Sequence, residues 1–143
     1  MFRLLTTLCL LLAALPATAQ DNPIVAQLTA FAEAYNAGNA QAIVTFYTDD
    51  AALLPQQSHA LIGHEAIGGH YAAAFASGAG NLRLDVQEIR QHGPSAAVEI
   101  GETLIDIDDT TIRGRYLHVW TLTDDGWLLS RDMYHVLAVG QPG

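Results

Sequence analysis

The second half of the chain is patterned for consecutive β-strands joined by short turns. Apolar and polar residues alternate from Leu82 to Gln87, which is typical of a strand with one buried face. Gly93-Pro94 and Asp125-Gly126 are turn signals, and the acidic run from Asp106 to Thr110 marks another turn. The strands are predicted over residues 82–87, 96–105, 112–123 and 127–139. Because short turns join neighbours in sequence, an antiparallel sheet is expected for this half.

The region before these strands has the periodicity of helices. One helix face is predicted from apolar residues spaced by four, three and four positions, namely Ile24, Leu28, Phe31 and Tyr35. Gly38 suits the end of this helix, and Asn39 is a suitable cap for the next. Further helices are predicted over residues 40–47 and 64–76, with a strand entered over 51–54. Helices followed by an antiparallel sheet predict an α+β fold.

The first nineteen residues have the layout of a secretory signal peptide. Arg3 precedes a mostly apolar run from Leu4 to Leu15, Pro16 ends the run, and Ala17-Thr18-Ala19 is a small-residue cleavage pattern. A run of this length is too short to cross a bilayer, although an uncleaved N-terminal anchor is the alternative. We therefore expect a signal peptide over 1–19, one domain over 20–143, and a periplasmic or secreted location.

Composition excludes several classes of function. The single cysteine, Cys9, lies within the expected signal peptide, so a cleaved chain has no disulfide, thiol nucleophile or cysteine metal site. The formal net charge is −9 and the chain contains no lysine, which disfavours nucleic acids and anionic membranes as partners. His59, His64 and His70 are not spaced as metal ligands on a helix or strand, so no metal and no cofactor are expected.

Three segments carry a resemblance to a known superfamily. Residues 31–55 read FAEAYNAGNAQAIVTFYTDDAALLP, residues 62–67 read IGHEAI, and residues 125–133 read DGWLLSRDM. Together these segments resemble nuclear-transport-factor-2-like domains, a superfamily that includes SnoaL-like cyclases, ketosteroid isomerases and the small SgcJ-like group. The resemblance implies a cone, in which a strongly bent antiparallel sheet packs against three N-terminal helices and encloses a pocket. It also implies that the domain is often a dimer formed through the sheet.

The resemblance does not carry over the ketosteroid isomerase machinery. The position that matches the general base of the isomerases is Leu54, and the position that matches their oxyanion tyrosine is Phe31. A leucine cannot accept a proton and a phenylalanine cannot donate one. Ketosteroid isomerase activity is therefore disfavoured.

Strand pairing predicts which side chains share the concave face. A two-residue turn at Asp125-Gly126 would pair Trp120 with Arg131, His118 with Met133, and Tyr116 with His135. A turn at Asp108-Asp109 would pair Glu99 with His118 and Glu102 with Arg115. One face would then hold ionisable and aromatic side chains, a mixture that suits a ligand pocket, namely Glu99, Tyr116, His118, Trp120, Arg131 and His135.

The candidate catalytic residues are His118 and Glu99. A carboxylate beside an imidazole can orient it or raise its pKa, which makes a general acid/base pair. The candidate pocket residues are Tyr47, Tyr116, Trp120, Arg131 and His135. Plainer interpretations remain open, because Glu99 and His118 also make an ordinary cross-strand pair. Likewise Trp120 and Arg131 can simply stack on the sheet, and Tyr47 can simply pack among the helices.

Three functions are compatible with this pattern. The first is an exported domain that binds a small, largely apolar ligand in its cone. The second is a cofactor-free SnoaL-like isomerase, cyclase or lyase that uses His118 with Glu99. The third is a non-catalytic dimerisation or interaction module whose cone is filled by side chains.

Overall fold

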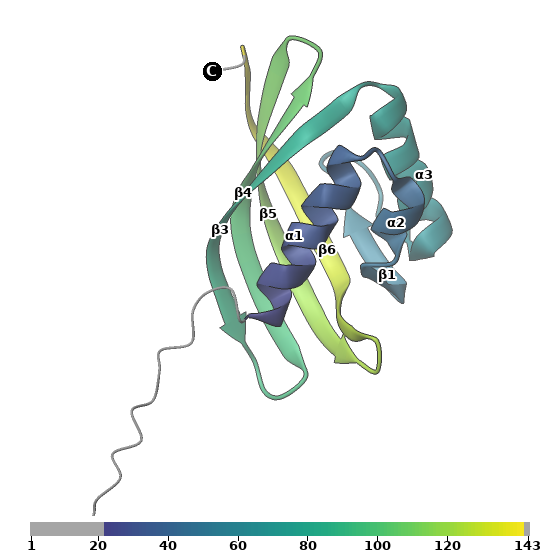
Figure 1. The fold of residues 1–143 in the computed structure, drawn as a ribbon, viewed down its shortest axis with the longest axis vertical. Helices are drawn as coiled ribbons and strands as arrows, with labels where there is room; N and C mark the ends of the chain where they lie inside the picture. Colours follow the sequence, from purple (N-terminus) through teal and green to yellow (C-terminus); the bar gives the residue numbers. More distant parts are fainter. Residues whose placement is uncertain (1–21, 142–143) are drawn as a thin grey trace, which may run out of the picture.

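The computed structural model describes residues 22–141, so the predicted signal peptide lies outside the described residues. Three helices lie on the concave side of a strongly bent sheet, as Figure 1 shows. The helices are α1 (Pro23–Asn36), α2 (Ala40–Val44) and α3 (Gly63–Ala76). The strands are β1 (Tyr47–Leu54), β2 (Leu61–Ile62), β3 (Ala79–Gln91), β4 (Ala96–Ile107), β5 (Thr110–Thr123) and β6 (Gly126–Gly140). The predicted α+β cone with three N-terminal helices is confirmed.

The sheet runs in the order β2-β1-β6-β5-β4-β3. The four long strands β3 to β6 form an antiparallel meander joined by short turns, as the sequence predicts. Strand β1 instead pairs with β6 in parallel, an arrangement that the expected antiparallel sheet does not include. The connection from β1 to the meander runs through α3, which covers one end of the concave face (Figure 1).

Helix α1 forms as its periodicity predicts. The Asn22 side chain accepts a hydrogen bond from the Ile24 amide at 2.9 Å and caps the helix. All four residues of the predicted apolar face are buried. Gly38 adopts a left-handed conformation with φ of 64°, and the Asn39 side chain then caps α2 by accepting from the Ala42 amide at 3.0 Å. These caps place α1 across the sheet as the wall of the cone.

Helix α2 is shorter than predicted, ending at Val44 rather than at residue 47. The backbone carbonyl of Phe46 accepts from the Leu129 amide at 2.8 Å, and Tyr47 is paired with Leu129 in the sheet. The helical spacing of Ile43 and Tyr47 was therefore misleading, because pairing with β6 overrides the local preference. The result is that Tyr47 enters the core as a strand residue. No helix within residues 22–141 is long and apolar enough to cross a membrane.

Gly101 on β4 makes room for a tyrosine that crosses the sheet. Gly101 is paired with Tyr116 on β5, and a methyl group at Gly101 would collide with the Tyr116 ring and with the Asp85 carbonyl. Without a side chain at this position, the Tyr116 ring lies over the backbone of β4. Its hydroxyl then reaches Glu99 at 2.6 Å. Gly101 is thus required for the placement of the polar groups described below.

We expect Gly101→Ala to destabilise the protein by about 1 to 3 kcal/mol, because the Asp85 carbonyl cannot move away without distorting β3. Urea unfolding measures the change. Gly69→Ala is the matched control, since Gly69 is exposed in α3 and a methyl group there meets nothing within 4 Å. That control should be neutral or stabilising by up to about 1 kcal/mol. Equal stabilities of Gly101→Ala and the wild type would show that Tyr116 does not depend on Gly101.

Candidate functional site

The register between β4 and β5 brings Glu99 and His118 together, as predicted. The two residues are paired, and His118 Nδ1 lies 2.8 Å from Glu99 Oε2. Glu99 is completely buried and His118 is 6% exposed. The predicted Glu102–Arg115 pair is also present, on the opposite face of the sheet. An ionisable pair buried this deeply is costly unless its hydrogen-bonding capacity is filled.

Glu99 receives three hydrogen bonds from aromatic neighbours on β5. The Tyr116 hydroxyl donates to Oε1 at 2.6 Å, and the Trp120 indole donates to Oε2 at 2.9 Å, beside His118. The Tyr116 ring also stacks on the His118 ring, with centroids 4.3 Å apart. Three donors satisfy most of the hydrogen-bonding capacity of a buried carboxylate. Glu99 therefore fixes the position of His118.

The predicted register between β5 and β6 is wrong by one residue over the site. His118 is paired with Asp132 rather than Met133, and Val119 is paired with Arg131. A one-residue shift moves every side chain of a strand to the other face. Arg131 is consequently exposed on the outer face and does not lie against Trp120, whose partner is Leu129.

The position of the turn and a β-bulge together cause this shift. The hairpin turns at Asp124-Asp125 rather than at the predicted Asp125-Gly126, which alone would place Arg131 opposite His118. The register then changes by one residue between Val119 and Trp120, and this change places Asp132 opposite His118. The extra residue on β6 is Ser130. The sequence carries a signal for it, because a polar run at residues 130–132 follows three consecutive apolar residues, 127–129, and breaks the alternation of a regular strand.

Asp132 is the functional candidate that the sequence interpretation missed. Its carboxylate is 3% exposed, and Oδ1 lies 3.4 Å from His118 Nε2. The Tyr47 hydroxyl donates to Oδ2 at 2.6 Å, and the Tyr71 hydroxyl lies 2.8 Å from that of Tyr47. Since Tyr47 donates its proton to Asp132, Tyr71 must donate to Tyr47. His118 is thus held between two buried carboxylates, Glu99 and Asp132.

The two carboxylates keep His118 charged. Burial lowers the pKa of His118, but the charge of Asp132 and the hydrogen bonds to Asp132 and Glu99 outweigh burial and raise it to about 9. At neutral pH the imidazole is therefore an imidazolium. Burial, followed by the charge of Asp132, raises the pKa of both Tyr47 and Tyr71, so these hydroxyls remain protonated.

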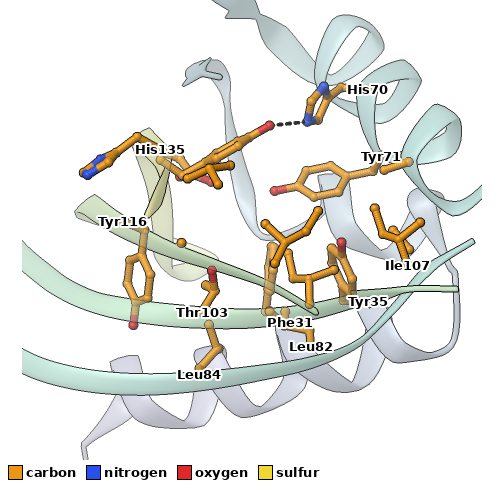
Figure 2. A pocket seen from close by; sticks show the side chains of 18 of the residues that line it. Phe31, Tyr35, His70, Tyr71, Leu82, Leu84, Thr103, Ile107, Tyr116 and His135 are labelled. Carbon is orange, nitrogen blue, oxygen red and sulfur yellow. Dashed lines mark hydrogen bonds between the residues drawn. The ribbon is translucent and has the colours of Figure 1, made fainter. Parts of the chain in front are cut away.

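A cavity of about 310 Å³ lies between the helices and the concave face of the sheet, and Figure 2 shows its wall. His118 and Asp132 line the cavity, whereas Glu99 does not. Most of the remaining wall is aliphatic or aromatic, contributed by Phe31, Tyr35, Tyr71, Ala74, Leu82, Leu84, Ile105, Ile107, Ile112, Tyr116, Tyr134 and Val136. The open cavity contradicts the interpretation in which side chains fill the cone.

A second polar pair lies on the wall formed by α3 and β6. His70 Nε2 is 3.0 Å from the Tyr134 hydroxyl, a contact drawn in Figure 2. Burial lowers the pKa of His70, although the charge of Asp132 opposes this effect, so His70 is neutral at pH 7. Both side chains line the cavity. The cavity thus has a charged pair on β5 and β6 and a neutral pair that joins β6 to α3.

The other predicted pocket residues differ in where they lie. Tyr116 lines the cavity, while Tyr47 and Trp120 are buried behind its wall and bond to Asp132 and Glu99. His135 touches the cavity, but it is exposed and Figure 2 shows its imidazole directed away from the interior. Arg131 does not contribute to the wall. Within residues 22–141 no three histidine, cysteine or acidic side chains are placed to hold a metal ion.

Comparison with protein families identifies this architecture. The family model described as the SnoaL-like domain matches residues 28–129, which is most of the described chain. Many solved structures share the fold, which confirms the nuclear-transport-factor-2-like resemblance. Assignment to the SgcJ-like group stays a prediction. No curated protein matches the chain.

Three solved structures illustrate the likeness. A proposed calcium/calmodulin dependent protein kinase II association domain from Xanthomonas campestris is 21% identical with a TM-score of 0.75, covering 87% of this chain and 93% of its own. A proposed scytalone dehydratase from Novosphingobium aromaticivorans is 11% identical with a TM-score of 0.73, and the match covers 85% of this chain and 86% of the dehydratase chain. An NTF-2 like protein of unknown function from Shewanella oneidensis is 22% identical with a TM-score of 0.71, and the match covers 78% of this chain and 95% of the Shewanella chain. Identities this low show the fold alone.

We expect the protein to lose stability as the pH rises from 6.5 to 9. The pKa of His118 is raised from its ordinary value of 6.5 to about 9, so its contribution is fully present below pH 6.5 and is lost as the pH rises through 9. The loss should be on the order of 3 kcal/mol, measured by urea unfolding at several pH values. The pKa of His70 is lowered, so the titration of His70 changes the stability below pH 6.5 and not between pH 6.5 and 9.

His118→Gln is the control for this pH dependence. Glutamine keeps a side chain that donates a hydrogen bond but cannot titrate, so most of the slope between pH 6.5 and 9 should disappear. The variant should also be less stable than the wild type at pH 6.5. An identical slope in the variant and the wild type would contradict the imidazolium.

Proposed function

This chain belongs to the SnoaL-like domain family, and we propose that it binds a small, largely apolar molecule in its cone and transfers a proton to or from it. The observation that carries the proposal is the ionised His118–Asp132 pair, which lines an otherwise mostly apolar cavity. Binding an apolar molecule there removes water from the pair and strengthens its electrostatic interactions. Groups with shifted pKa values in a cleft are a frequent property of active sites.

Each member of the charged cluster has a distinct role in this proposal. Asp132 is the general base, because its carboxylate faces the cavity and Oδ1 lies 3.4 Å from His118 Nε2. His118 is the general acid, since its imidazolium also faces the cavity. Glu99 is a positioning residue, because three donors occupy its oxygens behind the wall. This assignment replaces the pair His118 and Glu99 with the pair His118 and Asp132.

Such a pair suits cofactor-free isomerisation, cyclisation or elimination, in which one proton is removed and another is delivered. The fold is similar to that of a proposed scytalone dehydratase, and a dehydration is one reaction of this kind. Leu54 and Phe31 remain poor candidates for the chemistry, since neither side chain can exchange a proton. The proposed chemistry therefore lies on the sheet.

Ligand binding without turnover is the second candidate. It is favoured by the hydrogen bonding of the charged cluster, because no fully enclosed polar side-chain atom within residues 22–141 lacks a partner. A cluster satisfied in this way can be a static support for the cavity wall. The two candidates differ in whether Asp132 exchanges a proton with the ligand.

Export is proposed from the sequence of residues 1–19, which has the charged start, apolar run and cleavage pattern of a signal peptide. Export would place the protein in the periplasm or outside the cell. The intact mass of the protein purified from its host would then correspond to a chain that begins at Gln20.

A dimer formed through the outer face of the sheet is also proposed. Ile100, Leu117 and Met133 lie side by side on β4, β5 and β6, and Leu117 and Met133 are 39% and 49% exposed. A row of exposed apolar side chains is favourably buried against a second copy of the chain. The structure from Xanthomonas campestris, which is similar in fold, is named as an association domain.

Native mass spectrometry of the protein purified from its host should detect a retained small molecule. When this ligand is added to the protein in D₂O, we expect proton NMR to show deuterium entering the ligand. Asp132→Asn should bind the ligand but slow the exchange by about 10²- to 10⁴-fold, because the amide cannot accept the proton. Binding with no deuterium uptake by the wild type would instead establish the second candidate.

Met133→Glu should convert a dimer to a monomer, because it places a charge in the centre of the apolar row. Light scattering after size-exclusion chromatography measures the mass. Val139→Glu is the control, since Val139 is 65% exposed and lies at the far end of β6, where it pairs with Ile112. A wild type with the mass of one chain at high concentration would contradict the dimer.

A further inference from the structure

The hydroxyl of Tyr35 faces the cavity without a protein partner. Tyr35 lies on α1, is 5% exposed, and lines the cavity. Figure 2 shows its oxygen directed from α1 toward the interior. Within residues 22–141 no hydrogen-bond partner of this hydroxyl is found, although every fully enclosed polar side-chain atom has one. The hydroxyl is therefore reached through the cavity rather than sealed in the core.

The other phenol hydroxyls on the cavity wall are bonded within the protein. Tyr71 is bonded to Tyr47, Tyr116 donates to Glu99, and Tyr134 is bonded to His70. A tyrosine at a buried position normally finds such a partner, because an unpaired hydroxyl in an apolar environment costs free energy. Tyr35 departs from this pattern although its ring is tightly packed, edge to face, against Tyr71 and Phe75.

The Tyr35 hydroxyl is a hydrogen-bond donor throughout the physiological pH range. Burial, followed by the nearby Tyr134, raises the pKa of Tyr35 to about 12. Both tyrosines line the cavity, one on α1 and the other on β6. Burial, followed by the charge of Asp132, likewise raises the pKa of Tyr134 and Tyr71. An anionic group near these hydroxyls would be repelled by Asp132.

We propose that Tyr35 selects ligands with a neutral acceptor oxygen, of which an apolar carbonyl compound is the simplest class. Its hydroxyl would donate a hydrogen bond to the carbonyl oxygen while the apolar body of the ligand fills the cavity. A hydrocarbon would leave the hydroxyl unpaired, and an anion would face the Asp132 carboxylate. This inference rests on the proposed function, because it assigns a substrate class to the same cavity.

A pair of probes of matched shape tests the role of Tyr35. 2-Acetylnaphthalene carries a carbonyl group where 2-isopropenylnaphthalene carries a carbon–carbon double bond. Calorimetric titration gives the affinity of each probe for the wild type and for Tyr35→Phe. The ratio of the two affinities, carbonyl over hydrocarbon, should fall roughly three- to tenfold in Tyr35→Phe, which is the loss of one neutral hydrogen bond. Using a ratio cancels the different costs of removing the two probes from water.

Thr29→Val is the comparison variant, because it removes a hydroxyl from the exposed side of the same helix, where Thr29 Oγ1 donates to the Val25 carbonyl at 3.0 Å and does not line the cavity. Its affinity ratio should equal that of the wild type. Thermal unfolding distinguishes a role of the Tyr35 hydroxyl in ligand binding from a role in the fold. If the hydroxyl has no partner in the protein, Tyr35→Phe should be at least as stable as the wild type. A lower melting temperature for Tyr35→Phe would show that the hydroxyl supports the fold instead.

The outcomes separate this inference from the proposed function. If both probes bind but Tyr35→Phe leaves their affinity ratio unchanged, the role of Tyr35 is overturned and the binding cavity stands. An equal fall in the ratio for Thr29→Val also overturns it, because the effect is then not specific to Tyr35. If neither probe binds to the wild type, the proposed apolar binding site fails and the inference fails with it.

Discussion

The contact on which the rest of the site depends is the placement of His118 between Glu99 and Asp132. One carboxylate comes from β4 and the other from β6, so the ring joins three adjacent strands of the sheet. The cost of burying three ionisable groups is offset by aromatic donors, namely Tyr47, Tyr116 and Trp120. Removing one carboxylate would leave the imidazolium with half of its partners. The placement of these aromatic side chains is therefore linked to the two carboxylates that hold one charged histidine.

The two sides of the cavity wall at this charged cluster are very different. Behind the wall, every enclosed polar side-chain atom of residues 22–141 has a partner, and Glu99 is inaccessible. In front of the wall, His118 and Asp132 meet a space lined mainly by aliphatic and aromatic side chains. A polar pair that is held rigidly from behind and faces an apolar space is preorganised for proton transfer, because little reorganisation follows ligand binding. The hydroxyl of Tyr35 adds a donor to the same space from α1.

The sequence predicts the fold and half of the site. Periodicity places α1 and α3 correctly, and the turn at Asp108-Asp109 predicts the pairing of Glu99 with His118. The other half was missed at β6, where a turn one residue earlier than predicted and one bulged residue, Ser130, together place Asp132 rather than Met133 opposite His118. Local patterns do not fix where a bulge falls, since its position depends on packing across the sheet. Similarly, Tyr47 follows a helical spacing but becomes a strand residue, because the parallel pairing of β1 with β6 is a long-range contact.

The charge state of His118 is the central claim, and nitrogen-15 NMR of the imidazole tests it most directly. Its two ring nitrogens have distinct chemical shifts in the neutral tautomers and nearly equal shifts in the imidazolium. At pH 7 both nitrogens of His118 should carry a proton, because its pKa is raised to about 9. Substituting Asp132 by Asn should move the midpoint of this titration to lower pH, since one of the two neighbouring charges is removed. A neutral His118 with a single protonated nitrogen at pH 7 would contradict the account.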